Sequence, residues 1–129
     1  MPETTVFLYK DDDGSVPVKE WLAQLQARNL QAFAKCVVAI RRLALFGHEL
    51  RRPQADYLRD GIYELRAKKG HVNYRLLYFF HGKNVVVLAH ALTKENVVPE
   101  ADINRALERK KRHERNPEKH TYEETFDQT

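Results

Sequence analysis

The sequence has 129 residues and a hydrophobic content of 43%, a length and composition typical of one globular domain with its own core. It contains no apolar run near the roughly 20 residues of a membrane helix, no recognisable signal peptide and one cysteine, which excludes an internal disulfide, so we expect a cytoplasmic protein with no membrane partner. The net charge of +4 is unevenly distributed, because residues 28–115 carry +10 whereas residues 1–27 and 116–129 carry −3 each.

The first part of the sequence predicts a strand followed by two helices. Residues 5–9 are β-branched and aromatic, as in a strand. Apolar residues at helical spacing follow from Pro17, and a break near Asn29 separates a second helix that ends before Gly47. Two helices joined so closely form a helical hairpin. Cys36 falls on the apolar face of the second helix, where we expect a buried, unreactive thiol.

The second part predicts three antiparallel strands and a last helix. After a loop over residues 49–60, the pattern changes to that of strands, which we place at residues 62–68, 72–80 and 85–92. The nearly continuous apolar character of the last strand places it centrally in the sheet. Pro99 then opens a helix with a strongly basic end.

This element order predicts an α+β fold. We expect a small antiparallel sheet of about four strands, with the helices on one face: an N-terminal helical hairpin packed there and a C-terminal helix. The folded domain is expected to span residues 1–115, and residues 116–129 to form a polar acidic tail. The basic body favours a polyanionic partner such as nucleic acid, although a well-solvated basic surface has the same composition.

Strand alternation predicts a group of positive side chains on the sheet. Arg66 and Arg75 each lie on the sheet face opposite to that of the tyrosines in their own strand. His90 and Lys94 are an even number of residues apart and so point to the same face. On a helix-free face these side chains would form a cationic cluster suited to a phosphodiester, because arginine binds two phosphate oxygens at once. A second interpretation pairs each arginine with a neighbouring carboxylate and makes His90 a satisfied core histidine, and composition alone favours it. No metal-binding or phosphate-cradling motif occurs, so we expect no metal and no cofactor.

Several segments resemble, in order, the signature of a known family. They are Leu-Arg-Asp-Gly-Ile-Tyr-Glu-Leu-Arg at residues 58–66, Tyr-Arg-Leu-Leu-Tyr-Phe-Phe at 74–80, Val-Val-Val-Leu-Ala-His at 85–90, and Thr93-Lys94 before Pro99. With the opening at residues 16–22, the pattern resembles the HigB-like, phage-derived branch of the RelE/ParE toxin superfamily over about residues 5–115. Two positions depart from it: Leu92 replaces an aromatic residue and Glu95 replaces a second lysine.

The resemblance implies a RelE-like fold and the toxin of a type II toxin–antitoxin system. Such toxins are metal-independent endoribonucleases that cleave mRNA, commonly on the ribosome, and a helix-turn-helix antitoxin neutralises them. By this resemblance the catalytic residues are Arg66, Arg75 and Lys94, with His90 or Tyr78 as acid or base. We expect further contacts with nucleic acid from Arg59, Lys68, Lys69, Lys83, Arg109 and Lys110.

Two other functions stay open at this point. A ParE-like toxin would inhibit a protein target such as DNA gyrase through the basic last helix, and Arg66 would then be dispensable. A non-toxic binding module would use the basic surface only for contact with DNA or an antitoxin.

Overall fold

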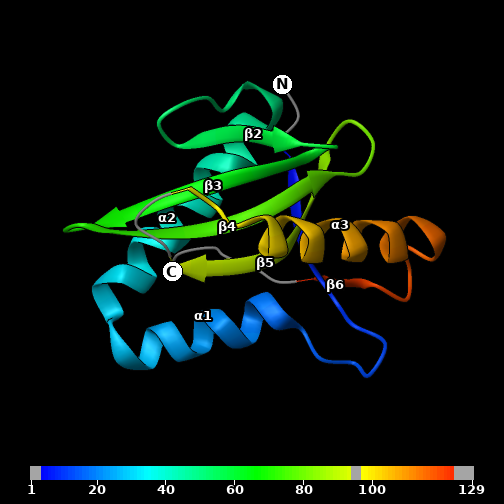
Figure 1. The fold of residues 1–129 in the computed structure, drawn as a ribbon, viewed down its shortest axis with the longest axis horizontal. Coiled ribbons are helices and arrows are strands. Elements are labelled where there is room, and N and C mark those ends of the chain that lie inside the picture. Colours follow the sequence, from blue (N-terminus) through cyan, green and yellow to red (C-terminus); the bar gives the residue numbers. More distant parts are fainter. Residues whose placement is uncertain (1–3, 94–96, 124–129) are drawn as a thin grey trace.

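A six-stranded mixed sheet organises the computed structural model, which describes residues 4–93 and 97–123 (Figure 1). The strands are β1 (Thr5–Tyr9), β2 (Ala55–Arg59), β3 (Ile62–Lys69), β4 (Val72–Phe80), β5 (Val85–Thr93) and β6 (Thr121–Glu123). The helices are α1 (Pro17–Arg28), α2 (Leu30–Phe46), α3 (Glu100–Arg115) and the 3₁₀ turn η1 (Gly47–Glu49). Within the described ranges, none of the helices has the length and apolar character of a membrane span.

The strand order β2-β3-β4-β5-β1-β6 differs from the predicted sheet. The pairs β2–β3, β3–β4 and β4–β5 are antiparallel. Strands β3, β4 and β5 match the three predicted strands, and β5 is central as expected. However, β1 runs parallel to β5, with Thr5 opposite Val85, and β6 pairs antiparallel with β1, with Leu8 opposite Tyr122. The α+β class is therefore confirmed and compatible with a RelE-like fold, but the expectation of about four antiparallel strands is wrong.

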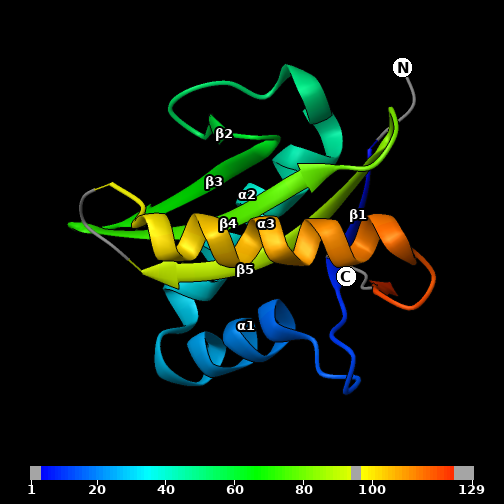
Figure 2. The same ribbon diagram turned by 45° about the vertical axis from the view of Figure 1, so that its right-hand side comes forward.

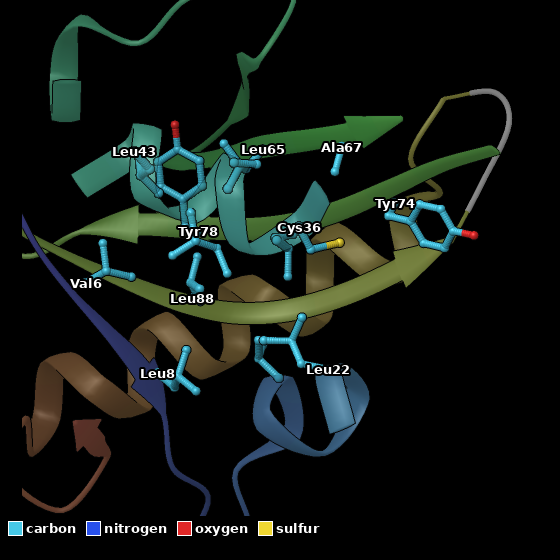
Figure 3. Close-up of a cluster of buried hydrophobic side chains, with 14 of the residues drawn as sticks. Val6, Leu8, Leu22, Cys36, Leu43, Leu65, Ala67, Tyr74, Tyr78 and Leu88 are labelled. Atoms are coloured by element: carbon cyan, nitrogen blue, oxygen red, sulfur yellow. The ribbon is translucent and has the colours of Figure 1, made fainter. Parts of the chain in front are cut away.

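Helices cover both faces of the sheet, whereas the sequence predicted helices on one face. Helices α1 and α2 pack on one face and α3 lies across β4 and β5 on the other (Figure 2). The first core contains Leu8, Leu65 and Tyr78 with α2 residues such as Leu43 (Figure 3). The second core lies beneath α3 and contains Ile62, Leu77, Phe79 and Ala106. Because β4 and β5 are apolar on both sides, both of their faces need a covering layer.

The residues around the helical hairpin explain its geometry. Asn29 ends α1 by donating its backbone N–H to Leu25, and its side chain caps α2 by accepting from the backbone N–H of Ala32 at 3.1 Å. Gly47 follows α2 at φ 50°, where a Cβ atom would lie 2.2 Å from Oγ1 of Thr4, so only glycine fits. Cys36 is fully buried, as predicted, and burial raises the pKa of its thiol to about 12, which disfavours the reactive thiolate.

Candidate active site

Glu64 holds two arginines side by side on the sheet face beneath α3. Glu64 and Arg66 are two residues apart on β3, and Arg75 of β4 lies directly opposite Arg66. Nε of Arg66 donates to Oε1 of Glu64 at 2.7 Å, and Nη1 of Arg75 donates to Oε2 at 2.8 Å. The Glu64 and Arg75 side chains are 3% and 8% exposed, whereas that of Arg66 is 29% exposed. The buried carboxylate therefore fixes one guanidinium that solvent and ligands can reach.

A second carboxylate reaches Arg66 from the edge strand. Oδ2 of Asp56, on β2, lies 3.3 Å from Nη2 of Arg66 and 3.1 Å from Nη2 of Arg52. The hydrogen bond from Arg52 and, more weakly, the charge of Arg66 hold the pKa of Asp56 below its ordinary value. Asp56 thus stays ionised and limits the rotation of the exposed guanidinium.

His90 reaches the same face through a bulge in β5. Tyr78 lies opposite Leu88 but Leu77 lies opposite His90, so β5 carries one extra residue at Ala89. The bulge places His90 on the Leu77 side of the sheet, beneath α3. Arg75 lies opposite Leu92, two residues along β5 from His90. We call Asp56, Glu64, Arg66, Arg75 and His90 the Arg66 cluster.

Helix α3 supplies the partners of the His90 imidazole. Its Nε2 lies 2.6 Å from Oδ1 of Asp102, and its Nδ1 lies 3.4 Å from Nη1 of Arg109. Because a guanidinium can only donate, Nδ1 carries the lone pair and Nε2–H donates to Asp102. Burial lowers the pKa of His90, although the hydrogen bond to Asp102 opposes the shift. The imidazole is therefore neutral near pH 7, with Nδ1 as its basic nitrogen.

These contacts correct the predicted environment of the cations. Arg66, Arg75 and His90 do share one face, but α3 covers part of it, so this face is not helix-free. The alternative in which each arginine pairs with a carboxylate is confirmed by these contacts, yet Arg66 stays accessible. Lys94 and Glu95 lie outside the described residues, and Leu92 packs in the core beneath α3.

Tyr78 lies apart from the Arg66 cluster. It is on the opposite face of the sheet, 1% exposed, among Leu43 and Leu65 (Figure 3). Burial raises the pKa of the Tyr78 hydroxyl, which makes loss of its proton less favourable. Alternation along β4 directs Tyr78 into the core shared with α2, so this geometry gives no support to its predicted role as acid or base.

The predicted nucleic-acid contacts are scattered. Lys68 is exposed and Lys69 is half-buried at the end of β3. Lys68 is two residues from Arg66 and therefore points to the same face of the sheet. Lys83 is exposed in the turn between β4 and β5, at the other end of these strands. Of these three lysines, Lys68 is the one that extends the face of the Arg66 cluster.

The remaining three predicted contacts engage α3 or belong to it. Nη2 of Arg59 donates to Glu100 at 2.9 Å and to Asn104 at 2.6 Å. Arg109 turns inward, donates to the backbone oxygen of Ala89 at 2.7 Å and lies over the Tyr9 ring. Lys110 pairs with Glu114 at 2.9 Å. Arg59 and Arg109 thus fasten α3 to the sheet.

Comparison with known families supports the sequence resemblance. The family described as "Phage derived protein Gp49-like (DUF891)" matches residues 20–111, which include the whole Arg66 cluster. The chain belongs to this Gp49-like family. It is a HigB-like, toxin-related family, which confirms the resemblance drawn from the sequence. No curated protein matches the chain.

The sequence patterns missed the carboxylates of the Gp49-like protein. Glu64 and Asp56 organise the arginines, and Asp102 orients His90. The signal for Glu64 was present, because a spacing of two residues in a strand puts Glu64 and Arg66 on one face. Asp56 and Asp102 carried no local signal, since each meets its partner through tertiary contacts between separate elements.

Proposed function

We propose that this Gp49-like protein is the toxin of a type II toxin–antitoxin system and acts as an endoribonuclease on mRNA. We further propose that it acts on the ribosome and that a helix-turn-helix antitoxin neutralises it. The observation that carries the proposal is the pair of arginines fixed by Glu64, with the partly exposed Arg66 on the same sheet face as the neutral His90. Membership of a toxin-related family supports it.

The Arg66 cluster matches the needs of RNA cleavage without an external nucleophile. Attack by the 2′-hydroxyl requires removal of its proton, stabilisation of the pentavalent phosphate and protonation of the departing 5′ oxygen. The exposed part of the Arg66 guanidinium would bind the phosphate, and buried Arg75 would keep Arg66 and Glu64 in position. His90 would accept the proton through Nδ1 once its 3.4 Å contact with Arg109 is given up, while Asp102 orients the ring. We assign charge neutralisation or proton donation to Lys94.

Mapping of mRNA 5′ ends after induced expression in a bacterial host tests this function. We expect new ends with the wild-type protein and about 10-fold to 100-fold fewer with Arg66→Ala, the loss expected for one charged hydrogen bond. The matched control is Arg42→Ala, because Arg42 is exposed on α2, which packs on the opposite face of the sheet. Growth arrest without new ends would contradict the ribonuclease function and favour a ParE-like protein target. Equal cleavage by Arg66→Ala would remove Arg66 from the mechanism.

The pH dependence of cleavage tests the role of His90. Because burial lowers the pKa of His90 from 6.5, the neutral base persists below pH 6.5 and is lost only at lower pH. We expect kcat/KM on translating ribosomes to be level near pH 7 and to fall tenfold per unit on the acid side of the His90 pKa.

Two variants separate His90 from other titrating groups in this experiment. His90→Gln should lose activity and also lose the fall of kcat/KM at acidic pH. Arg66→Ala should be slower but should keep that fall. If kcat/KM of His90→Gln still falls at the same acidic pH as that of the wild type, the base is another residue.

A further inference from the structure

A hollow of about 650 Å³ lies beside the edge strand β2, on the side of the sheet that faces α2. Its lining includes His48 of η1, Arg51 and Arg52 of the following loop, Tyr57 of β2 and Tyr63 of β3. This volume falls within the range of small-ligand sites, roughly 300–1,000 Å³. We call it the Tyr57 hollow. The functional assignment above uses none of its aromatic residues.

The aromatic wall of the hollow is held in place and yet exposed. Tyr57 is 53% exposed, and its hydroxyl accepts a hydrogen bond from the backbone N–H of Gly61 at 3.1 Å. Its ring meets the edge of the Tyr63 ring at 5.0 Å between centroids, and Tyr63 stacks on buried Tyr78. His48 stacks on Phe80 at 3.6 Å. Rings fixed in this way can stack on a ligand with little loss of conformational entropy.

The rim of the hollow carries two exposed arginines. Arg51 lines the hollow and donates to the backbone oxygen of His48. Arg52 pairs with Asp56, and its side chain is 77% exposed. Aromatic faces combined with arginines are typical of sites that stack a nucleobase and bind its phosphate. The aliphatic part of the lining is limited to Leu50 and Ala55, which favours a stacked base over an apolar peptide.

Asp56 connects the Tyr57 hollow with the Arg66 cluster. Oδ2 of Asp56 lies 3.1 Å from Arg52 and 3.3 Å from Arg66, so one carboxylate contacts a cation of each site. Among residues 4–93 and 97–123, β2 is the outermost strand on this side of the sheet (Figure 1). A single-stranded RNA with one phosphate at Arg66 can therefore pass around the edge strand β2 and place a neighbouring nucleotide in the hollow.

We propose that the Tyr57 hollow binds one nucleotide of single-stranded RNA flanking the phosphate held at Arg66. The base stacks on Tyr57 and its phosphate contacts Arg51 or Arg52. This inference rests on the proposed function for the position of the scissile phosphate, but the hollow can be tested by binding alone. It predicts that the edge of the sheet, as well as the face beneath α3, contributes to RNA affinity.

The test measures fluorescence anisotropy of a labelled, 2′-O-methylated RNA octamer, which cannot be cleaved, with the full chain. Tyr57→Leu should weaken binding about 5-fold to 100-fold, the range measured for loss of one base stack. Tyr57→Phe should restore most of the affinity because it keeps the ring. Arg52→Gln should weaken binding and reduce its salt dependence, whereas Arg42→Gln, on exposed α2 surface, should leave both unchanged. Matching urea-unfolding midpoints show that the variants are folded.

The outcomes separate this inference from the proposed function. Loss of RNA affinity in Tyr57→Leu supports the hollow even if no variant cleaves mRNA. Cleavage by the wild-type protein together with unchanged octamer affinity and unchanged KM in Tyr57→Leu overturns the hollow and leaves the ribonuclease function intact. Unchanged octamer affinity in both Tyr57→Leu and Arg52→Gln also overturns it.

Discussion

Glu64→Ala is expected to lower the free energy of unfolding by about 3–5 kcal/mol, the loss typical of removing one partner from a buried ion pair. The Glu64 side chain is 3% exposed and accepts hydrogen bonds from both Arg66 and Arg75. Without it, the 8% exposed Arg75 guanidinium loses a negative partner in a poorly hydrated place and faces Arg66 across the strands. Urea denaturation at pH 7 measures the difference.

A double variant distinguishes lost charge pairing from lost packing. Glu64→Leu should be strongly destabilising, whereas Glu64→Leu combined with Arg75→Met should recover a large part of the stability, because both buried charges are then absent. A Glu64→Ala protein within about 0.5 kcal/mol of the wild type, the range of ordinary surface substitutions, would show that the carboxylate does not hold this site together.

A second large effect is expected from pH, through His113 near the end of α3. His113 is 1% exposed, and its Nε2–H donates to Oγ1 of Thr121 at 3.0 Å. Nδ1 has no hydrogen-bond partner among the described residues. Burial, followed by the charges of His81 and His120 and opposed by Glu114, lowers the pKa of His113 from 6.5 to about 4. The folded protein therefore keeps this imidazole neutral where the unfolded chain protonates it.

The expected result is a loss of stability on acidification. Between pH 6.5 and 4 the unfolded chain binds a proton that the folded protein does not, so the free energy of unfolding falls as the pH falls. The loss from His113 reaches about 3 kcal/mol near pH 4 and is absent above pH 6.5. Because carboxylates also titrate here, urea denaturation at pH 7.5, 5.5 and 4.5 should compare the wild type with His113→Leu. Equal pH slopes for the two proteins would contradict the assignment.

The missed strands show where sequence patterns lose their information. Residues 55–59 form β2, although they fall within the loop predicted over residues 49–60, which contains Pro53. Ala55 is the one fully buried residue of this edge strand, so no alternation of apolar and polar residues marks it. β6 is three residues long in a polar segment, and its pairing with β1 depends on tertiary contacts. The central strands were predictable because burial on both faces gives long apolar runs.

The candidate site was predictable in its cations and unpredictable in what surrounds them. Alternation correctly placed Arg66 and Arg75 on the sheet face that points away from Tyr63 and Tyr78, since side chains in a strand alternate with a period of two. The position of α3 over this face was not predictable, because the partial apolar stripe of that helix can pack on either side of the sheet. The same uncertainty hid Asp102, whose contact with His90 exists only once α3 has docked.

The position of β1 has a consequence for the order in which the protein acquires its structure during synthesis. β1 is made first, but its partners β5 and β6 begin at residues 85 and 121. Such distant pairings are slow to form, because a long loop must close before they are stabilised. A nascent chain shorter than about 85 residues therefore leaves β1 without its neighbours in the sheet and lacks His90 and α3 altogether. The proposed activity at the Arg66 cluster would consequently begin only after residues 85–115 have been translated.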